Sequence, residues 1–88
     1  MKINHTEIAK RLGMLDWFKN IQLAKLLENT HKGSDFSSIK NDSLIHRLLQ
    51  EVDELKEAIK TGSHSEIARE CADVANFAMF IAVKHNKE

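Results

Sequence analysis

Apolar residues recur every three or four positions along this chain, and no stretch shows the period of two that is typical of strands. The chain has no proline, so its glycines are the main breaks in the pattern, at Gly13, Gly33 and Gly62. The pattern predicts an all-α protein with a short helix over residues 4–13, a second helix over 14–31, and two further helices over 43–60 and 64–84.

The first two predicted helices carry recognisable end signals. Asn4 and Glu7 have the spacing of a capping box, and Gly13 is expected to end or kink the first helix. Gly33 fits a C-terminal cap of the second. This second helix is amphipathic, and its expected apolar side consists of Met14, Trp17, Phe18, Ile21, Ala24 and Leu27. A polar loop should follow over residues 32–42, ending in a cap at Asn41, Asp42 or Ser43.

The last two helices differ in how their polar residues are distributed. Along residues 43–60 there is one apolar stripe, with Glu51 at its edge and Glu54 further round, while Asp53 and Glu57 face away. Residues 64–84 start with a second capping box, formed by Ser63 and Glu66. From Ile67 onward this helix is apolar nearly all round, which predicts that a second subunit packs against it.

Two acidic pairs with i,i+3 spacing flank Gly62 symmetrically. They are Glu51 with Glu54 and Glu70 with Asp73, and this spacing places both members of a pair on nearly the same helix face. Glu54 and Glu70 are equally far from Gly62 in sequence, so both should lie roughly 12 Å from the turn. The four carboxylates are therefore expected to converge, and oxygen-only ligands suit Mg²⁺ or Mn²⁺.

Solvated surface charge is the alternative interpretation of these acids. Against it, Glu70 and Asp73 interrupt the most apolar helix and have no lysine or arginine in the turn that follows them. Buried carboxylates need a partner, but the pattern alone leaves both interpretations open. Asn76 continues the acidic face, either as a buried amide bonded to another helix or as a substrate ligand.

A few other residues have two interpretations each. Asn29, His31 and Lys32 are either solvated residues at a helix end or substrate contacts. Trp17 and Phe18 are either core residues or a stacking surface for a nucleobase. The Glu-x-x-His spacing of residues 28–31 is discounted as a di-iron element, because such bundles carry it twice and the last helix has no histidine within reach.

Composition narrows the class of protein. With 88 residues the chain is expected to form a single domain over 1–88, small enough to need oligomerisation for stability. A net charge of +0 argues against a nucleic-acid polymer as partner. The single cysteine, Cys71, indicates a reducing cytoplasm. The N-terminus lacks the apolar core of a signal peptide, and residues 74–83 are too few to span a membrane.

The motif Glu51-x-x-Glu54, followed by Glu70-x-x-Asp73, resembles the metal-binding signature of the MazG-like, all-α nucleoside triphosphate pyrophosphohydrolases. Their relatives include dimeric dUTPases and dCTPases. Small phage or mobile-element members are the most similar, on segments 48–59 and 68–79, on Lys25-Leu26 and on Asn29-x-His31-Lys32-Gly33. Two positions depart from this group: Gln50 replaces a second glutamate, and Ser34-Asp35-Phe36 replaces an aromatic segment.

The resemblance implies an antiparallel helical bundle completed by dimerisation or tetramerisation. It also implies Mg²⁺-dependent cleavage of a nucleoside triphosphate, expected to be a deoxynucleotide, into monophosphate and pyrophosphate in nucleotide-pool house-cleaning. The metal-binding and catalytic residues would be Glu51, Glu54, Glu70 and Asp73, and the substrate contacts Trp17, Asn29, His31, Lys32 and Asn76. A non-catalytic nucleotide- or protein-binding module of the same fold is the alternative that Gln50 keeps open, and a purely structural bundle is a third.

Overall fold

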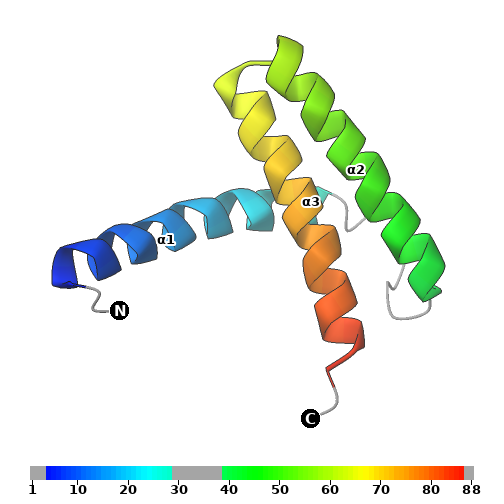
Figure 1. Cartoon of the computed structure of the whole chain (residues 1–88), viewed down its shortest axis with the longest axis horizontal. Helices are drawn as coiled ribbons and strands as arrows, with labels where there is room; N and C mark the ends of the chain where they lie inside the picture. The colour runs from blue at the N-terminus through cyan, green and yellow to red at the C-terminus, as the bar shows by residue number, and fades with distance from the viewer. Residues whose placement is uncertain (1–3, 29–38, 87–88) are drawn as a thin grey trace.

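The computed structural model describes residues 4–28 and 39–86. Within these residues it contains three helices, α1 (His5–Glu28), α2 (Asn41–Thr61) and α3 (His64–Lys84), and no strand. α2 and α3 form an antiparallel hairpin, and α1 crosses this hairpin against α3 (Figure 1). The all-α class predicted from the sequence is confirmed. None of the described helices combines the length and hydrophobicity that crossing a bilayer requires.

α1 is one continuous helix, so the predicted division into helices 4–13 and 14–31 is wrong. Glycine inside a helix costs roughly 0.5–1 kcal/mol relative to alanine, which is too little to end a helix that proline does not interrupt. A Cβ atom at Gly13 would meet nothing within 4 Å, so no neighbour forces a break there. The predicted start is confirmed, because Asn4 Oδ1 accepts a hydrogen bond from the Glu7 amide at 2.8 Å. The predicted cap Gly33 lies outside the described residues.

Gly62 allows the tight turn between α2 and α3. Its amide donates to the Ala58 carbonyl at 2.6 Å, and its φ of −87° is open to any residue. Glycine is needed for space instead, since a Cβ atom at this position would lie 2.7 Å from the Ala58 carbonyl oxygen. α3 then begins as predicted, with Ser63 Oγ accepting from the Glu66 amide at 3.2 Å.

The start of α2 lacks the predicted side-chain cap. Lys40 is the N-cap residue and makes no side-chain capping bond, so the prediction of a cap at Asn41, Asp42 or Ser43 is wrong. Contacts from the end of α3 hold this segment instead. Lys84 Nζ donates to the Ile39 carbonyl, and His85 Nε2 lies 3.2 Å from Asn41 Oδ1. The C-terminal end of α3 therefore secures the position at which α2 begins.

The core is small and lies along α3. The buried apolar side chains among the described residues are those of Leu44, Ala58 and Ala72, and Asn76 is buried with them. α3 packs against both α1 and α2, while α1 and α2 do not approach each other closely over their described lengths. Two sides of the nearly all-apolar α3 are thus covered within one chain. Met79 and Val83 remain 37% and 50% exposed.

α1 packs on α3 with a face that matches the predicted one at Phe18 and Ile21 only. Met14, Trp17 and Leu27 were expected on the apolar side, but they are 61%, 60% and 62% exposed. The half-buried residues are instead Phe18, Ile21, Gln22, Lys25 and Leu26. The prediction counted apolar residues alone, whereas two polar residues of this face, Gln22 and Lys25, have partners on α3.

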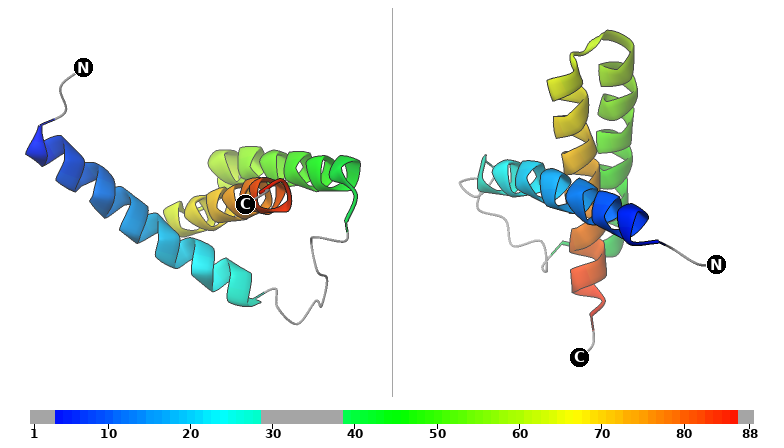
Figure 2. Two further views of the ribbon diagram at one scale, coloured as in Figure 1. Left: turned by 90° about the horizontal axis from the view of Figure 1, so that it is seen from below. Right: turned by 90° about the vertical axis from the view of Figure 1, so that its left-hand side faces the viewer.

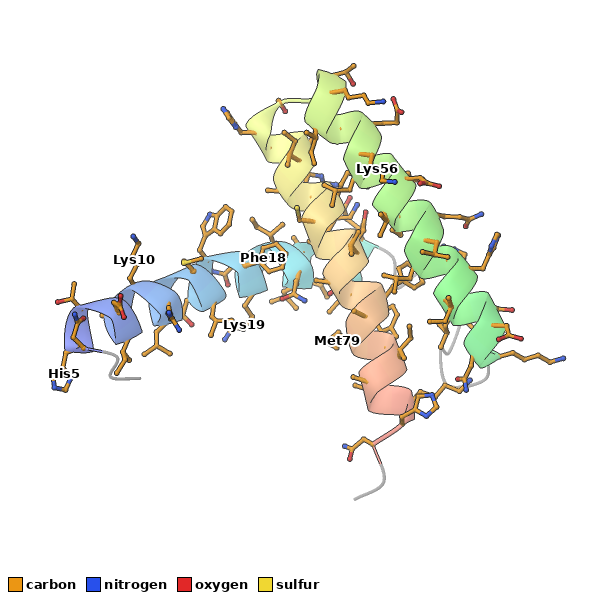
Figure 3. All side chains as sticks on the ribbon, viewed as in Figure 1. His5, Lys10, Phe18, Lys19, Lys56 and Met79 are labelled. Carbon is orange, nitrogen blue, oxygen red and sulfur yellow. The ribbon has the colours of Figure 1, made fainter. Side chains whose placement is uncertain are left out.

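The N-terminal half of α1 projects away from the hairpin, as Figure 2 shows from two sides. Its side chains, including those of His5 and Lys10, extend from a helix that no other described element faces (Figure 3). The radius of gyration is 15.1 Å, against roughly 12 Å for a compact domain of this length. The molecule is therefore a packed hairpin with one protruding helix.

Candidate metal centre

Three carboxylates from the two hairpin helices meet at one place. Glu51 comes from α2, and Glu70 and Asp73 come from successive turns of α3. Each offers an oxygen, and these atoms all lie within 4.8 Å of one another. All three side chains are half-buried. Three of the four carboxylates that were predicted to converge thus do so in the structure, while the roles of these residues stay predictions.

Glu54 lies beside this three-acid group without belonging to it. Its side chain is exposed, and its carboxyl contacts those of Glu51 and Glu70. The other two acids of this stretch, Asp53 and Glu57, are exposed as predicted, and Glu57 pairs with Lys60 at 3.7 Å. α2 therefore contributes Glu51 to the centre and Glu54 to its edge, while Asp53 and Glu57 face solvent.

Burial and mutual repulsion raise the pKa values of all three acids, which opposes their simultaneous ionisation. Burial, followed by the hydrogen bond and charge of Glu54, raises the pKa of Glu51 to about 7. The pKa of Glu70 is raised by burial, then by the charges of Asp73 and Glu54. Burial also raises the pKa of Asp73, although the Lys25 ammonium opposes this shift. Near neutral pH the centre therefore either holds protons or requires a cation.

The residues present fit a divalent cation. Glu51 Oε2 and Glu70 Oε2 are buried and accept no hydrogen bond from any described group, and an ionised oxygen in that position needs a positive partner. The donor set is oxygen alone, which suits hard ions such as Mg²⁺ or Mn²⁺. Two ligands on opposite sides of Mg²⁺ lie roughly 4.2 Å apart, so atoms within 4.8 Å of one another are near the required separation.

Lys25 of α1 lies against this centre, which the sequence analysis did not predict. Its Nζ is 3.4 Å from Asp73 Oδ2, and both side chains are 15% exposed. A signal was present in the sequence, because Lys25 follows Phe18 by seven residues and Ile21 by four. This spacing places it on the helix face that packs on α3.

A second ion pair joins the end of α1 to α3. Arg69 Nη2 donates to both carboxylate oxygens of Glu28, at 2.7 and 2.9 Å. Glu28 also lies 4.0 Å from Lys25 Nζ. The Arg69 and Glu28 side chains are 43% and 46% exposed, so solvent screens their attraction and the pair adds little to stability. Its consequence is geometric, because it places the Glu28 carboxylate next to Lys25.

The residues predicted to contact substrate are distributed over several places. Asn76 is 4% exposed and is bonded to α1, since Nδ2 donates to the Gln22 carbonyl and Oδ1 accepts from Gln22 Nε2, both at 3.2 Å. This matches the structural interpretation of Asn76, and its substrate role stays untested. Trp17 lines an open hollow of about 550 Å³ together with Ile21, His64 and Arg69, among others. The remaining candidates, Asn29, His31 and Lys32, lie outside the described residues.

A comparison with protein families identifies the fold around this centre. The model of the MazG nucleotide pyrophosphohydrolase domain matches residues 39–88, which are more than half of the chain and include α2, α3 and all four predicted acids. The chain belongs to the MazG family. The family predicted from the sequence is therefore confirmed, and it is a family of nucleotide pyrophosphohydrolases.

One curated relative extends the comparison. The histidine biosynthesis trifunctional protein of Candida albicans is 46% identical to this chain over 61 residues. The aligned segment covers 67% of this chain but 7% of that much longer protein. No solved structure matches this chain.

Proposed function

We propose that this MazG-family protein hydrolyses a nucleoside triphosphate, preferably a deoxynucleotide, to the monophosphate and pyrophosphate with the help of Mg²⁺. The observation that carries the proposal is the group formed by Glu51, Glu70 and Asp73, in which two buried oxygens have no described partner. Membership of the MazG family connects such a centre with nucleotide pyrophosphate chemistry. The proposed role is the removal of unwanted nucleotides in the cytoplasm.

In the proposed reaction, water attacks the α-phosphorus, the α–β phosphoanhydride bond breaks, and pyrophosphate leaves. A divalent cation, when bound, neutralises phosphate oxygens and makes a bound water more acidic. Glu51, Glu70 and Asp73 would hold that cation. Glu54 adjoins the group and remains exposed, which supports a role in orienting the water and accepting its proton.

Substrate recognition is proposed to involve α1 and its C-terminal continuation. The exposed Trp17 ring offers a stacking surface for a base at the open hollow between α1 and α3. Asn29, His31 and Lys32 are proposed to contact sugar or phosphate. For Asn76 this role requires that its bonds to Gln22 be exchanged for bonds to the substrate.

We also propose that the protein acts as a homodimer or homotetramer. Ile8, Leu12 and Leu15 follow one another at i, i+4 and i+7, so they lie on one face of α1. They are 42%, 56% and 66% exposed in the single chain. A second copy that covers this face would bury apolar surface that the small core of one chain leaves in water.

Incubation of the purified protein with each dNTP and NTP in the presence of Mg²⁺, followed by a pyrophosphate assay, tests the activity. We expect pyrophosphate and monophosphate in equal amounts from at least one nucleotide, and none after chelation of the metal. An absence of pyrophosphate from every nucleotide would contradict the enzyme proposal.

The alternative is a non-catalytic nucleotide-binding module of the same fold, and Gln50 is the residue that favours it. Gln50 stands where many MazG-like proteins carry a glutamate. Its side chain is exposed, and its Nε2 lies 3.3 Å from His46 Nε2. Calorimetric nucleotide binding without turnover would support this alternative. A histidine-biosynthetic role is not transferred from the Candida albicans protein, because the match covers so little of it.

A further inference from the structure

Lys25 has two carboxylates within reach, one inside the metal centre and one outside it. Its Nζ is 3.4 Å from Asp73 Oδ2 and 4.0 Å from Glu28 Oε2. The Lys25 and Asp73 side chains are both 15% exposed, whereas the Glu28 side chain is 46% exposed. The lysine therefore stands at the boundary between the half-buried centre and the more open end of α1.

We infer that Lys25 is a positioning residue that holds Asp73 while the centre is metal-free, competes with the divalent cation for it, and pairs with Glu28 once the cation is bound. This inference rests on the proposed function. A lysine suits such an exchange, because its ammonium is a point charge with three donors on a flexible stem. A movement within its side-chain length transfers it between two acceptors that are already in place.

Charge explains why the exchange is favoured. Without metal, the Lys25 ammonium offsets part of the repulsion among the clustered carboxylates. With a divalent cation in the centre, an ammonium at Asp73 would face like charge at short range, while a half-buried ammonium without any partner would also be costly. Glu28 offers the alternative partner, and the two hydrogen bonds from Arg69 hold its carboxylate there.

Titration calorimetry with Mg²⁺ on the full chain tests this with Lys25→Met, which removes the charge and keeps the length of the side chain. We expect Mg²⁺ to bind about tenfold more tightly, since the competing cation is gone. In EDTA the same variant should unfold at a lower temperature than the wild type. If Lys25 had only a structural role, the Mg²⁺ affinity of Lys25→Met would be unchanged or lower than that of the wild type. Either result would overturn the inference.

Three further variants sharpen the test. Lys25→Arg keeps the charge and should return Mg²⁺ affinity close to the wild-type value. Glu28→Gln removes the second partner and should weaken Mg²⁺ binding several-fold. Lys19→Met removes an exposed charge from the same helix and should change nothing. If Lys25→Met does not fold, unchanged Mg²⁺ affinity in Glu28→Gln overturns the inference.

The outcomes also separate this inference from the proposed function. If the wild-type protein and Lys25→Met bind Mg²⁺ with the same affinity, the proposed function stands and the inference about Lys25 is wrong. A wild-type protein that takes up no Mg²⁺ contradicts the metal of the proposed function, and the inference about Lys25 falls with it.

Discussion

The α2–α3 hairpin and the N-terminal half of α1 are equally helical, yet they use their apolar residues in opposite ways. The hairpin contains the buried side chains of Leu44, Ala58 and Ala72 and gathers its acids at one place. The projecting half of α1 contains no buried residue and exposes Ile8, Leu12 and Leu15. The hairpin therefore holds the centre by intrachain packing, whereas this part of α1 has its apolar face available for another chain.

The C-terminal half of α1 lies between these two extremes. It contacts α3 through half-buried apolar side chains such as Phe18 and Ile21, and also through polar pairs, with Gln22 bonded to Asn76 and Lys25 paired with Asp73. This half of α1 therefore adds an ion pair and hydrogen bonds beside the centre as well as apolar packing.

Glu70→Gln should lower pyrophosphate release by at least about 100-fold, because it removes a charged ligand from the centre. Circular dichroism should show the helical content unchanged, since the amide fits the same space. Glu57→Gln is the matched control on α2, where the glutamate is exposed and pairs with Lys60, and it should retain wild-type activity. Full activity in Glu70→Gln would show that Glu70 is not a metal ligand of the active site.

Leu12→Asp should weaken self-association by at least about 100-fold, because it places a charge in the centre of the exposed apolar face of α1. Sedimentation measurements at micromolar concentration would then show a monomer. Lys10→Asp introduces the same side chain on the opposite side of the helix and should leave the oligomer intact. A wild-type protein that sediments as a monomer would refute the proposed use of this face.

Gly62→Ala and Gly13→Ala should change stability in opposite directions. A Cβ atom at Gly62 would lie 2.7 Å from the Ala58 carbonyl oxygen, so this change should destabilise the fold by about 1–3 kcal/mol. At Gly13 there is open space in a helix interior, so alanine should stabilise the fold by about 0.5–1 kcal/mol. Urea unfolding measures both, and destabilisation by Gly13→Ala would contradict a continuous α1.

The metal-free protein should lose stability as the pH rises from about 4.5 to about 7. The pKa of Glu51 is raised from 4.5 to about 7 in the folded state, and those of Glu70 and Asp73 are raised as well. Between these pH values the folded protein binds more protons than the unfolded chain. Proton binding therefore stabilises the fold fully below the pKa of the acids in the unfolded chain, and this stabilisation is lost as the pH rises through their pKa in the folded state. After allowance for solvent screening, Tm in EDTA should fall by about 5 °C.

Two controls accompany the pH experiment. Glu51→Gln should flatten the dependence of Tm on pH, because the amide does not titrate. Added Mg²⁺ should restore stability at the alkaline end, where the carboxylates are ionised and able to bind it. A Tm that rises steadily through this range in EDTA would show that the clustered acids do not repel as the structure indicates.

Local sequence patterns were enough to predict the helical class, the hairpin and the approach of its acids. These features depend on local rules: the helical period, the Ser63 cap, the turn at Gly62 and the equal spacing of Glu51 and Asp73 from it. The same local rules explain why Glu51 borders the core while Asp53 and Glu57 face solvent. The MazG resemblance could be recognised because all four acids lie within this locally determined hairpin.

The position of α1, and the identity of its residues that contact α3, depend on tertiary packing and could not be predicted. A weakly amphipathic helix can be rotated about its axis at little cost, so periodicity selected Trp17 for the interior, whereas the structure places Lys25 and Gln22 there. The partners of these two residues, Asp73 and Asn76, are about fifty residues away along the chain. No pattern confined to a few helical turns can report a pairing at that distance, because such a pairing exists only once α3 is in place to receive it.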